Sequence, residues 1–345
     1  SGANLKGMNM ISDIYFRLLL DTITKDPSIK EKPITFKDFS LGETEGDPAT
    51  TYFSYLVEFV FQNNPQSNMG LSFGKNVVAL NLCDFFRMIS TAETVGECLS
   101  ATVSIYHILG LLPYPVVYKG PQVSSVAIAF PYEPTSEACA RRFTSEVFFA
   151  YGLDLFQKAV SKDVKPIRMF LDYPKPDYFD QYQQLFKCEI IYDSPISLVE
   201  FPTSMLSASL PSQNDTLHNI YMAKAFEHWA ATKRNQSFRY RAITHLMSQS
   251  GCNFSSVSLA KAMSISTRGL QKRLAAENST YSQVCKQARR ELAKICLLQK
   301  GMNFDQTANA LGFQTQVSFR KFYKEQFGVS PEARLLLKPE PLEFA

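Results

Sequence analysis

The sequence predicts two regions of different fold class: an α+β region with a small antiparallel sheet, followed by an all-α region. Five short stretches rich in Val, Ile, Phe and Tyr predict strands, and all of them lie between residues 115 and 201. Pro, Gly and Asp separate these stretches. After residue 237 apolar residues recur only at helical spacing. Helices and strands that occupy separate stretches of a chain are typical of α+β folds.

The spacing of the apolar residues places the elements of the first region. Helices are predicted at residues 51–63, 94–109 and 136–161, and strands at residues 115–119, 124–132, 166–173, 188–192 and 196–201. Thr94 and Glu97 have the spacing of a capping box, which would begin the second helix. Residues 211–236 predict a closing helix and a connection to the second region.

The second region begins with the pattern of a helix-turn-helix unit at residues 257–277. A first helix is predicted at residues 257–263, and Ser266 follows the turn as the N-cap of a second helix. Leu270 and Leu274 are four residues apart, so they share the buried side of that helix. The polar side chains left on its other side, which we expect to contact DNA bases, are Thr267, Arg268, Gln271 and Lys272.

The same pattern recurs about 48 residues later. Residues 303–310 predict a first helix, Gly312 suits a turn position with positive φ, and residues 314–326 predict a second helix. Phe319 and Tyr323 are expected to face its core. The side chains available to a DNA groove would then be Thr315, Gln316, Arg320 and Lys321.

A single helix, predicted at residues 281–299, joins the two units. Its length would be roughly 28 Å, close to the roughly 34 Å between successive major-groove faces on one side of DNA. One connecting helix could therefore hold the two second helices in neighbouring turns of the groove. The basic residues that would add phosphate contacts if they face outward are Lys286, Arg289, Arg290 and Lys294.

The charge of the chain is divided unevenly. From Asn235 onward 16 Lys and Arg residues stand against 7 Asp and Glu residues, whereas the preceding part holds 20 against 25. A basic final third suggests that this end meets a polyanion. No apolar run reaches the roughly 18 residues that a membrane span needs.

Cysteine and histidine usage excludes several classes of site. The seven cysteines never form a CxxC pair, which is typical of buried thiols in a reducing compartment, so we expect a cytoplasmic protein. The four histidines belong to no metal-ligand pattern, and no phosphate-binding loop, dinucleotide fingerprint or GxSxG motif is present. We therefore expect no metal and no cofactor.

Residues from about 237 to 334 resemble the DNA-binding domain of the AraC/XylS family of bacterial transcription regulators. The residues that carry this resemblance are Ser266, Leu270, Gln271, Lys272, Arg273, Leu274, Ala308, Leu311, Gly312, Phe313, Phe319, Phe327, Gly328, Val329, Ser330 and Pro331. Two helix-turn-helix units at this spacing are a specific signal, whereas one alone would be weak.

The first region resembles, more loosely, the effector-binding domain of the subgroup related to ornithine-utilisation regulators. The matching residues are Gly70, Leu71, Ser72, Phe73, Gly74, Thr94, Val95, Gly96, Glu97, Leu171, Asp172, Tyr173, Pro174, Lys175, Pro176, Tyr182, and those at positions 188–192. The resemblance implies an α+β sensor for a small-molecule effector of unknown identity. Arg141, Arg142 and Arg168 are candidates to meet an anionic effector.

The two resemblances imply a sequence-specific regulator that binds double-stranded DNA at an operator or promoter, contacts RNA polymerase and most often activates. Dimerisation would place two such DNA-binding domains on one operator. We divide the chain into a tag remnant (residues 1–10), an effector-sensing domain (11–211), a linker helix (212–236), a DNA-binding domain (237–335) and a tail (336–345).

Two alternatives remain open from the sequence. The first is a regulator controlled by a protein partner instead of a metabolite, which the sequence scarcely separates from the ligand-sensing hypothesis. The second is an enzyme with a DNA-binding appendage, as in DNA-repair methyltransferases that carry a related helix-turn-helix. Those enzymes use a reactive cysteine in a Pro-Cys-His-Arg motif, which this chain lacks, so we expect no enzyme activity.

Overall fold

The structure is a computed structural model that describes residues 10–29, 31, 33, 48–77, 83–109, 113–131, 137–160, 164–232, 237–248 and 254–335. The predicted tag remnant, apart from Met10, and the predicted tail lie outside the described residues. Residues 233–236 of the predicted linker helix and Cys252 also lie outside them.

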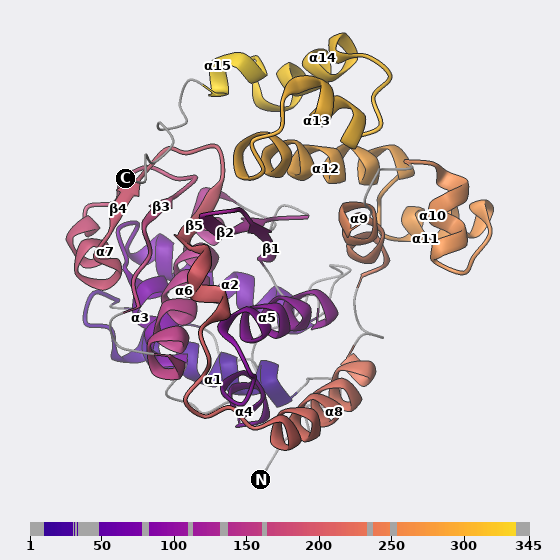
Figure 1. The fold of residues 1–345 in the computed structure, drawn as a ribbon. Coiled ribbons are helices and arrows are strands. Elements are labelled where there is room, and N and C mark those ends of the chain that lie inside the picture. The colour runs from indigo at the N-terminus through magenta and orange to yellow at the C-terminus, as the bar shows by residue number, and fades with distance from the viewer. Residues whose placement is uncertain are drawn as a thin grey trace.

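A layer of helices forms the N-terminal part (Figure 1). Its members are α1 (Met10–Lys25), α2 (Pro48–Asn63), α3 (Met69–Val77), α4 (Cys83–Ser90), α5 (Val95–Leu109) and α6 (Glu137–Ala159). Thr94 caps α5, since its hydroxyl accepts a hydrogen bond from the N–H of Glu97 at 3.2 Å. The other half of the predicted capping box differs, because the Glu97 carboxylate accepts from the N–H of Glu93 and not from that of Thr94.

Five strands form one mixed sheet in the order β1-β2-β5-β3-β4. They are β1 (Tyr114–Lys119), β2 (Val123–Ala129), β3 (Arg168–Phe170), β4 (Glu189–Ile191) and β5 (Ser197–Pro202). Three neighbouring pairs are antiparallel, as expected, and the β3–β4 pair is parallel. The predicted small antiparallel sheet is thus found with one parallel pair, because α7 (Phe179–Phe186) carries the chain back so that β4 runs in the direction of β3.

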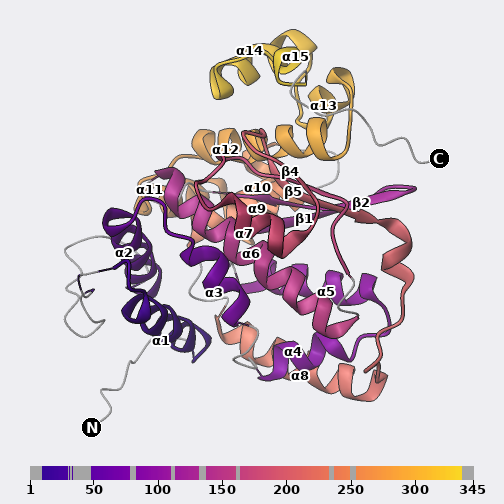
Figure 2. The ribbon, with the colours of Figure 1, turned by 90° about the vertical axis from the view of Figure 1, so that its left-hand side faces the viewer.

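The sheet separates two apolar cores, because successive side chains of a strand point to opposite faces. On β2, Val126 and Ile128 pack with Phe148 and other residues of α6. Ala127 and Ala129 belong to the core of the C-terminal helices. Figures 1 and 2 show the sheet between α5 and α6 on one side and α12 on the other. A single strand therefore contacts both halves of the protein.

The glycines of the Gly70–Gly74 motif allow α3 to lie very close to α6. A Cβ atom on Gly70 would come within 2.7 Å of the Cβ of Glu146, and one on Gly74 within 2.8 Å of the backbone oxygen of Val147. Glu146 is fully buried beside α3, where its Oε1 accepts hydrogen bonds from the hydroxyls of Tyr178 and Tyr182, both at 2.5 Å. Burial raises the pKa of the Glu146 carboxyl from 4.5 to about 7.

The C-terminal part is helical throughout its described residues. After the 3-10 helix Thr203–Ser207, the elements are α8 (Asp215–Thr232), α9 (Phe238–Ser248), α10 (Ser256–Ala262), α11 (Thr267–Ala276), α12 (Tyr281–Lys294), a π-helical turn (Ile295–Gln299), α13 (Phe304–Ala310), α14 (Gln316–Phe327) and α15 (Pro331–Leu335). The predicted all-α fold, with a long helix between two helix-turn-helix units, is confirmed. The predicted connecting helix is continuous, and its last turn is π-helical.

Candidate DNA-binding interface

The first helix-turn-helix unit consists of α10 and α11. Ser264 turns the chain with a φ of 57°, and the Ser266 hydroxyl accepts a hydrogen bond from the N–H of Gly269, which caps α11. Leu270 and Leu274 are completely buried, as predicted. The four predicted DNA-contacting side chains, Thr267, Arg268, Gln271 and Lys272, are all exposed. This edge of α11 is therefore accessible as it stands.

The second unit consists of α13 and α14. Asn303 forms a complete capping box with Gln306 at the start of α13, and Gly312 turns the chain with a φ of 71°. Phe319 and Tyr323 of α14 are completely buried. Figure 1 shows the first unit beyond one end of α12 and the second unit above α12. Both units share one apolar core with α12.

The two buried residues of each helix allow α11 and α14 to be aligned position by position. Phe319 and Tyr323 occupy the positions that Leu270 and Leu274 occupy in α11. In this register the matching positions are Ser266 and Thr315, Thr267 and Gln316, Arg268 and Val317, Gln271 and Arg320, and Lys272 and Lys321. Thr315 is thus an N-cap, and its hydroxyl accepts from the N–H of Ser318 at 3.2 Å.

Sequence reasoning missed one residue of this surface. Val317 is 74% exposed at the position that matches Arg268. An exposed valine on a groove-facing helix can contact the methyl group of thymine. A comparison of the two units by their buried pairs, 49 residues apart, would have identified Val317. Lys324, one turn after Arg320, is exposed as well.

Two of the predicted residues of α14 already have partners within the protein. Gln316 donates a hydrogen bond to the carboxylate of Asp305 at the start of α13. Arg320 pairs with Glu332 of α15 at 2.6 Å, and its guanidinium lies over the ring of Phe304. Thr315 and Lys321 are exposed. Among the described residues, the groove-facing edge of α11 therefore has no internal partners, whereas that of α14 is partly engaged.

Both parts of the chain match known families. Residues 53–210 match the arabinose-binding domain of AraC transcription regulators, and residues 259–335 match a helix-turn-helix domain. The chain belongs to the AraC family of transcription regulators. Members of this family regulate transcription and are not enzymes. The resemblance inferred from the motifs is thereby confirmed.

Individual relatives are distant. The HTH-type transcriptional regulator VqsM of Pseudomonas aeruginosa is 26% identical over 151 residues, which are 43% of this chain and 46% of that protein. The ornithine utilization regulator of the same organism is 20% identical over 266 residues, 76% of this chain and 77% of that protein. The crystal structure of the transcriptional regulator CdpR, also from Pseudomonas aeruginosa, covers 93% of this chain and 97% of its own, with 18% identity and a TM-score of 0.46. The match to VqsM thus spans about half the length of that relative.

In this AraC-family chain the four basic residues of α12 could add phosphate contacts only if they face outward, and they differ in exposure. Lys286 is exposed, Arg289 and Arg290 are half-buried, and Lys294 is buried. Arg289 donates a hydrogen bond to the carbonyl oxygen of Leu311 at 3.0 Å, and its guanidinium lies over the rings of Phe254 and Phe313. It joins residues on either side of α12, so only Lys286 of the four is fully available to a phosphate.

Lys294 is buried because α12 packs on the sheet. Its ammonium pairs with Glu291 at 2.6 Å, and the two side chains are 5% and 2% exposed. The N–H of Phe130, at the end of β2, donates to the same carboxylate at 3.4 Å. Gln287 donates to the carbonyl oxygen of Phe130 at 3.1 Å. Lys294 therefore does not face outward, and the condition for a phosphate contact is not met there.

The π-helical turn after α12 continues this contact. Gln299 is buried, and its Nε2 donates to the carbonyl oxygens of Val116 at 2.8 Å and of Ser125 at 3.4 Å. These oxygens belong to β1 and β2. Extra residues in a helical turn often mark functional positions. The connecting element of the DNA-binding domain is thus bonded directly to the sheet of the arabinose-binding-type domain.

The described residues hold no group of three or more His, Cys, Asp or Glu side chains that could bind a metal ion. Among them, no helix is both long and apolar enough to cross a membrane. The arginines considered for an anionic effector all lie near carboxylates of the chain: Arg141 pairs with Asp172 at 2.8 Å, Arg168 with Glu200 at 2.5 Å, and Arg142 lies 4.0 Å from Glu146.

Proposed function

We propose that this chain regulates transcription by binding a specific DNA sequence with α11 and α14 in two neighbouring segments of the major groove. The proposed DNA-contacting residues are Thr267, Arg268, Gln271, Lys272, Thr315, Gln316, Arg320 and Lys321. The observation that carries the proposal is the common register of the two helices. Each buries two residues four apart and leaves its opposite edge to solvent, which is the arrangement that a groove-binding helix needs.

The internal partners of α14 are compatible with this proposal. The Arg320–Glu332 pair is about half exposed, with side-chain exposures of 42% and 44%. Exposed ion pairs of this kind contribute only about 0–1 kcal/mol. A guanine that accepts two hydrogen bonds from Arg320 offers roughly 1–3 kcal/mol of discrimination. DNA can therefore replace Glu332 as the partner of Arg320.

Base-resolved binding measurements test the proposal. With a selected operator and all its single-base variants, Arg268→Ala and Arg320→Ala should each relax the preference at one base position, with a loss of about 1–3 kcal/mol for the preferred base. Lys224→Ala, on the exposed face of α8, is the control and should leave the preference unchanged. A merely structural role for Arg320 would weaken all sequences equally. Unchanged preferences in both arginine variants would refute the assignment.

We propose further that a small molecule bound to the N-terminal domain controls DNA binding or contact with RNA polymerase, and that the usual result is activation. A ligand can act only if it binds one conformation better than another. The domain boundaries that we propose are residues 11–211, 212–236 and 237–335. Cytoplasmic location and a homodimer on one operator fit the same role, since the DNA target lies in the cytoplasm of a bacterium and a dimer would add a second DNA-binding domain.

A further inference from the structure

An apolar cavity of about 90 Å³ lies between α5, α6 and the sheet of the N-terminal domain. Its wall includes Leu99 of α5, Phe149 and Leu153 of α6, and Val126 and Phe201 of the sheet. Protein interiors contain few voids larger than a water molecule. A void of this size with an apolar lining is therefore suited to an apolar group of a ligand.

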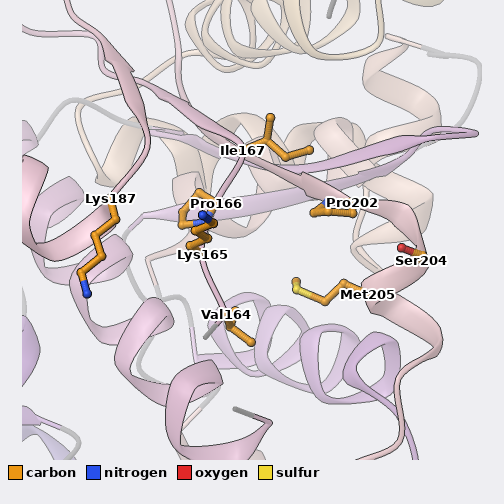
Figure 3. A pocket seen from close by; sticks show the side chains of 8 residues that line it. All are labelled: Val164, Lys165, Pro166, Ile167, Lys187, Pro202, Ser204 and Met205. Carbon is orange, nitrogen blue, oxygen red and sulfur yellow. The ribbon is translucent and has the colours of Figure 1, made fainter. Parts of the chain in front are cut away.

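The cavity adjoins a hollow of about 510 Å³ on the surface. Val164, Lys165, Pro166 and Met205 line both spaces. Figure 3 shows Lys187 and Lys165 toward one side of the hollow and Pro202, Ser204 and Met205 toward the other. The two spaces are therefore adjacent, so that a ligand with one end in the cavity would have its other end in the hollow.

Among the described residues, the charged side chains that line the hollow are both cationic. Lys165 and Lys187 are exposed on its rim, and no described Asp or Glu lines it. None of the ion pairs found between described residues includes either lysine. Nearby Arg168, in contrast, is paired with Glu200. Among the described residues, the positive charges beside the cavity that have no ion-pair partner are thus these two lysines, and not the arginines named as candidates from the sequence.

We propose that the cavity and the hollow together bind an aliphatic anion, with the end of an unbranched alkyl chain in the cavity and the anionic head group between Lys165 and Lys187. The proposal rests on the proposed function, because it specifies the effector class of the N-terminal domain. A sugar fits poorly, since its hydroxyls would lose water without finding partners in an apolar lining. Thr102, one of the few polar wall residues, already donates its hydroxyl proton to the backbone of Cys98.

The size of the cavity favours a chain over a ring. A cavity of about 150 Å³ with an apolar lining holds benzene, whereas the cavity here has only about 90 Å³. A ring would have to enter whole, but an alkyl chain can place its last few carbons in the cavity and leave the rest in the hollow. Calorimetric titration of the full chain should therefore show tighter binding of octanoate than of 3-phenylpropanoate. Equal or tighter binding of the aromatic acid would overturn the alkyl part of the proposal. This comparison needs no variant.

A comparison of charged and neutral ligands tests the role of the anionic head group. Octanoate and octyl phosphate should bind the full chain, and octan-1-ol should bind more weakly. Lys165→Gln/Lys187→Gln should weaken octanoate about fivefold, the effect expected for two exposed ion pairs, and leave octan-1-ol unchanged. Lys119→Gln, on an exposed end of β1, is the matched control and should change neither. An equal loss for both ligands, or no loss for either, would overturn the role of the lysines.

A substitution in α6 tests whether the ligand occupies the cavity. Gly152 lines it, and a Cβ atom built there meets no other atom within 4 Å. Gly152→Leu should therefore fill the cavity, keep the circular dichroism spectrum of the wild type and abolish octanoate binding. A folded variant that still binds octanoate with wild-type affinity would overturn the site. If the variant does not fold, the comparison of octanoate with 3-phenylpropanoate on the wild-type chain still decides the matter.

The failure of this proposal can be distinguished from the failure of the proposed function. A chain that binds its operator but not octanoate or octyl phosphate would refute the ligand class and leave DNA binding intact. A chain that binds octanoate but shows no sequence preference on DNA would refute the regulator and leave the site intact.

Discussion

The buried pair between Glu291 and Lys294 offers the sharpest test of how the two domains are joined. The Lys294→Met substitution keeps most of the side-chain volume and removes the positive charge. It leaves the Glu291 carboxylate, whose side chain is 2% exposed, with the weak 3.4 Å hydrogen bond from the N–H of Phe130 as its remaining contact of this kind among the described residues. An isolated buried charge of this kind is strongly unfavourable. We therefore expect Lys294→Met to be severely destabilising.

The magnitude follows from the burial of both partners. Removal of one member of a buried ion pair costs about 3–5 kcal/mol, whereas replacement of both members by neutral groups is often nearly neutral. Glu291→Gln/Lys294→Met should therefore recover most of the loss, because the oxygen of the introduced amide could still accept the hydrogen bond from the N–H of Phe130. The coupling free energy in a double-mutant cycle should be about 2–4 kcal/mol.

Urea denaturation of the full chain, followed by circular dichroism, measures these values. With a slope of about 3 kcal/mol per molar urea, Lys294→Met should lower the midpoint by about 1 M or more. Lys286→Met, on the exposed side of the same helix, is the matched control and should stay within about 0.5 kcal/mol of the wild type. Equal midpoints for Lys294→Met and Lys286→Met, or strictly additive single substitutions, would show that α12 is not docked on the sheet.

Three further predictions concern single sites. Because the pKa of Glu146 is raised from 4.5 to about 7, its stabilising effect is fully present below pH 4.5 and is lost as the pH rises through 7. Glu146→Gln should remove this dependence on pH and be more stable than the wild type at pH 8 by about 3 kcal/mol; parallel pH profiles of the two proteins would contradict it. Gly328 ends α14 with a φ of 73°, so Gly328→Ala should destabilise the protein by about 1 kcal/mol. Gly152→Ala within α6 should instead stabilise the protein by about 0.5–1 kcal/mol. Urea midpoints that shift in the same direction for both variants would refute this contrast. Glu332→Gln should remove the ion pair with Arg320 and raise the affinity for the operator about twofold to fivefold in a filter-binding titration. A lower affinity would show that Glu332 positions Arg320 for DNA.

Features that depend on neighbouring residues could be predicted from the sequence. Ser266 and Asn303 mark helix starts because their side chains satisfy nearby backbone N–H groups, and both do so in the structure. Gly312 adopts the positive φ that its place in the turn suggested. The buried sides of α11 and α14 follow from helical spacing alone. The two helix-turn-helix units were therefore predictable almost residue by residue.

Features that depend on distant residues could not be predicted in this way. Helical spacing says which residues of α12 share a side, but not that the sheet of the other domain would cover Lys294. The parallel β3–β4 pair depends on the crossover through α7, whose direction no strand pattern reveals. Arg141 and Arg168 were candidates for an effector until the fold brought Asp172 and Glu200 beside them. Pairing between residues far apart in sequence decides each of these cases.

The two faces of β2 suggest how the proposed ligand could alter DNA binding. Val126 lines the cavity on one face, and its neighbour Ser125 accepts the hydrogen bond from Gln299 on the other. The distance between the two sites is thus the thickness of a single strand. Closely packed interiors transmit small displacements because they have little free volume to absorb them. A ligand that moves β2 would therefore change the contact with the π-helical turn, and this turn leads directly into α13 and α14. On this basis a ligand should act on the second helix-turn-helix unit more than on the first, so that base preferences at the α14 half of the operator change while those at the α11 half do not.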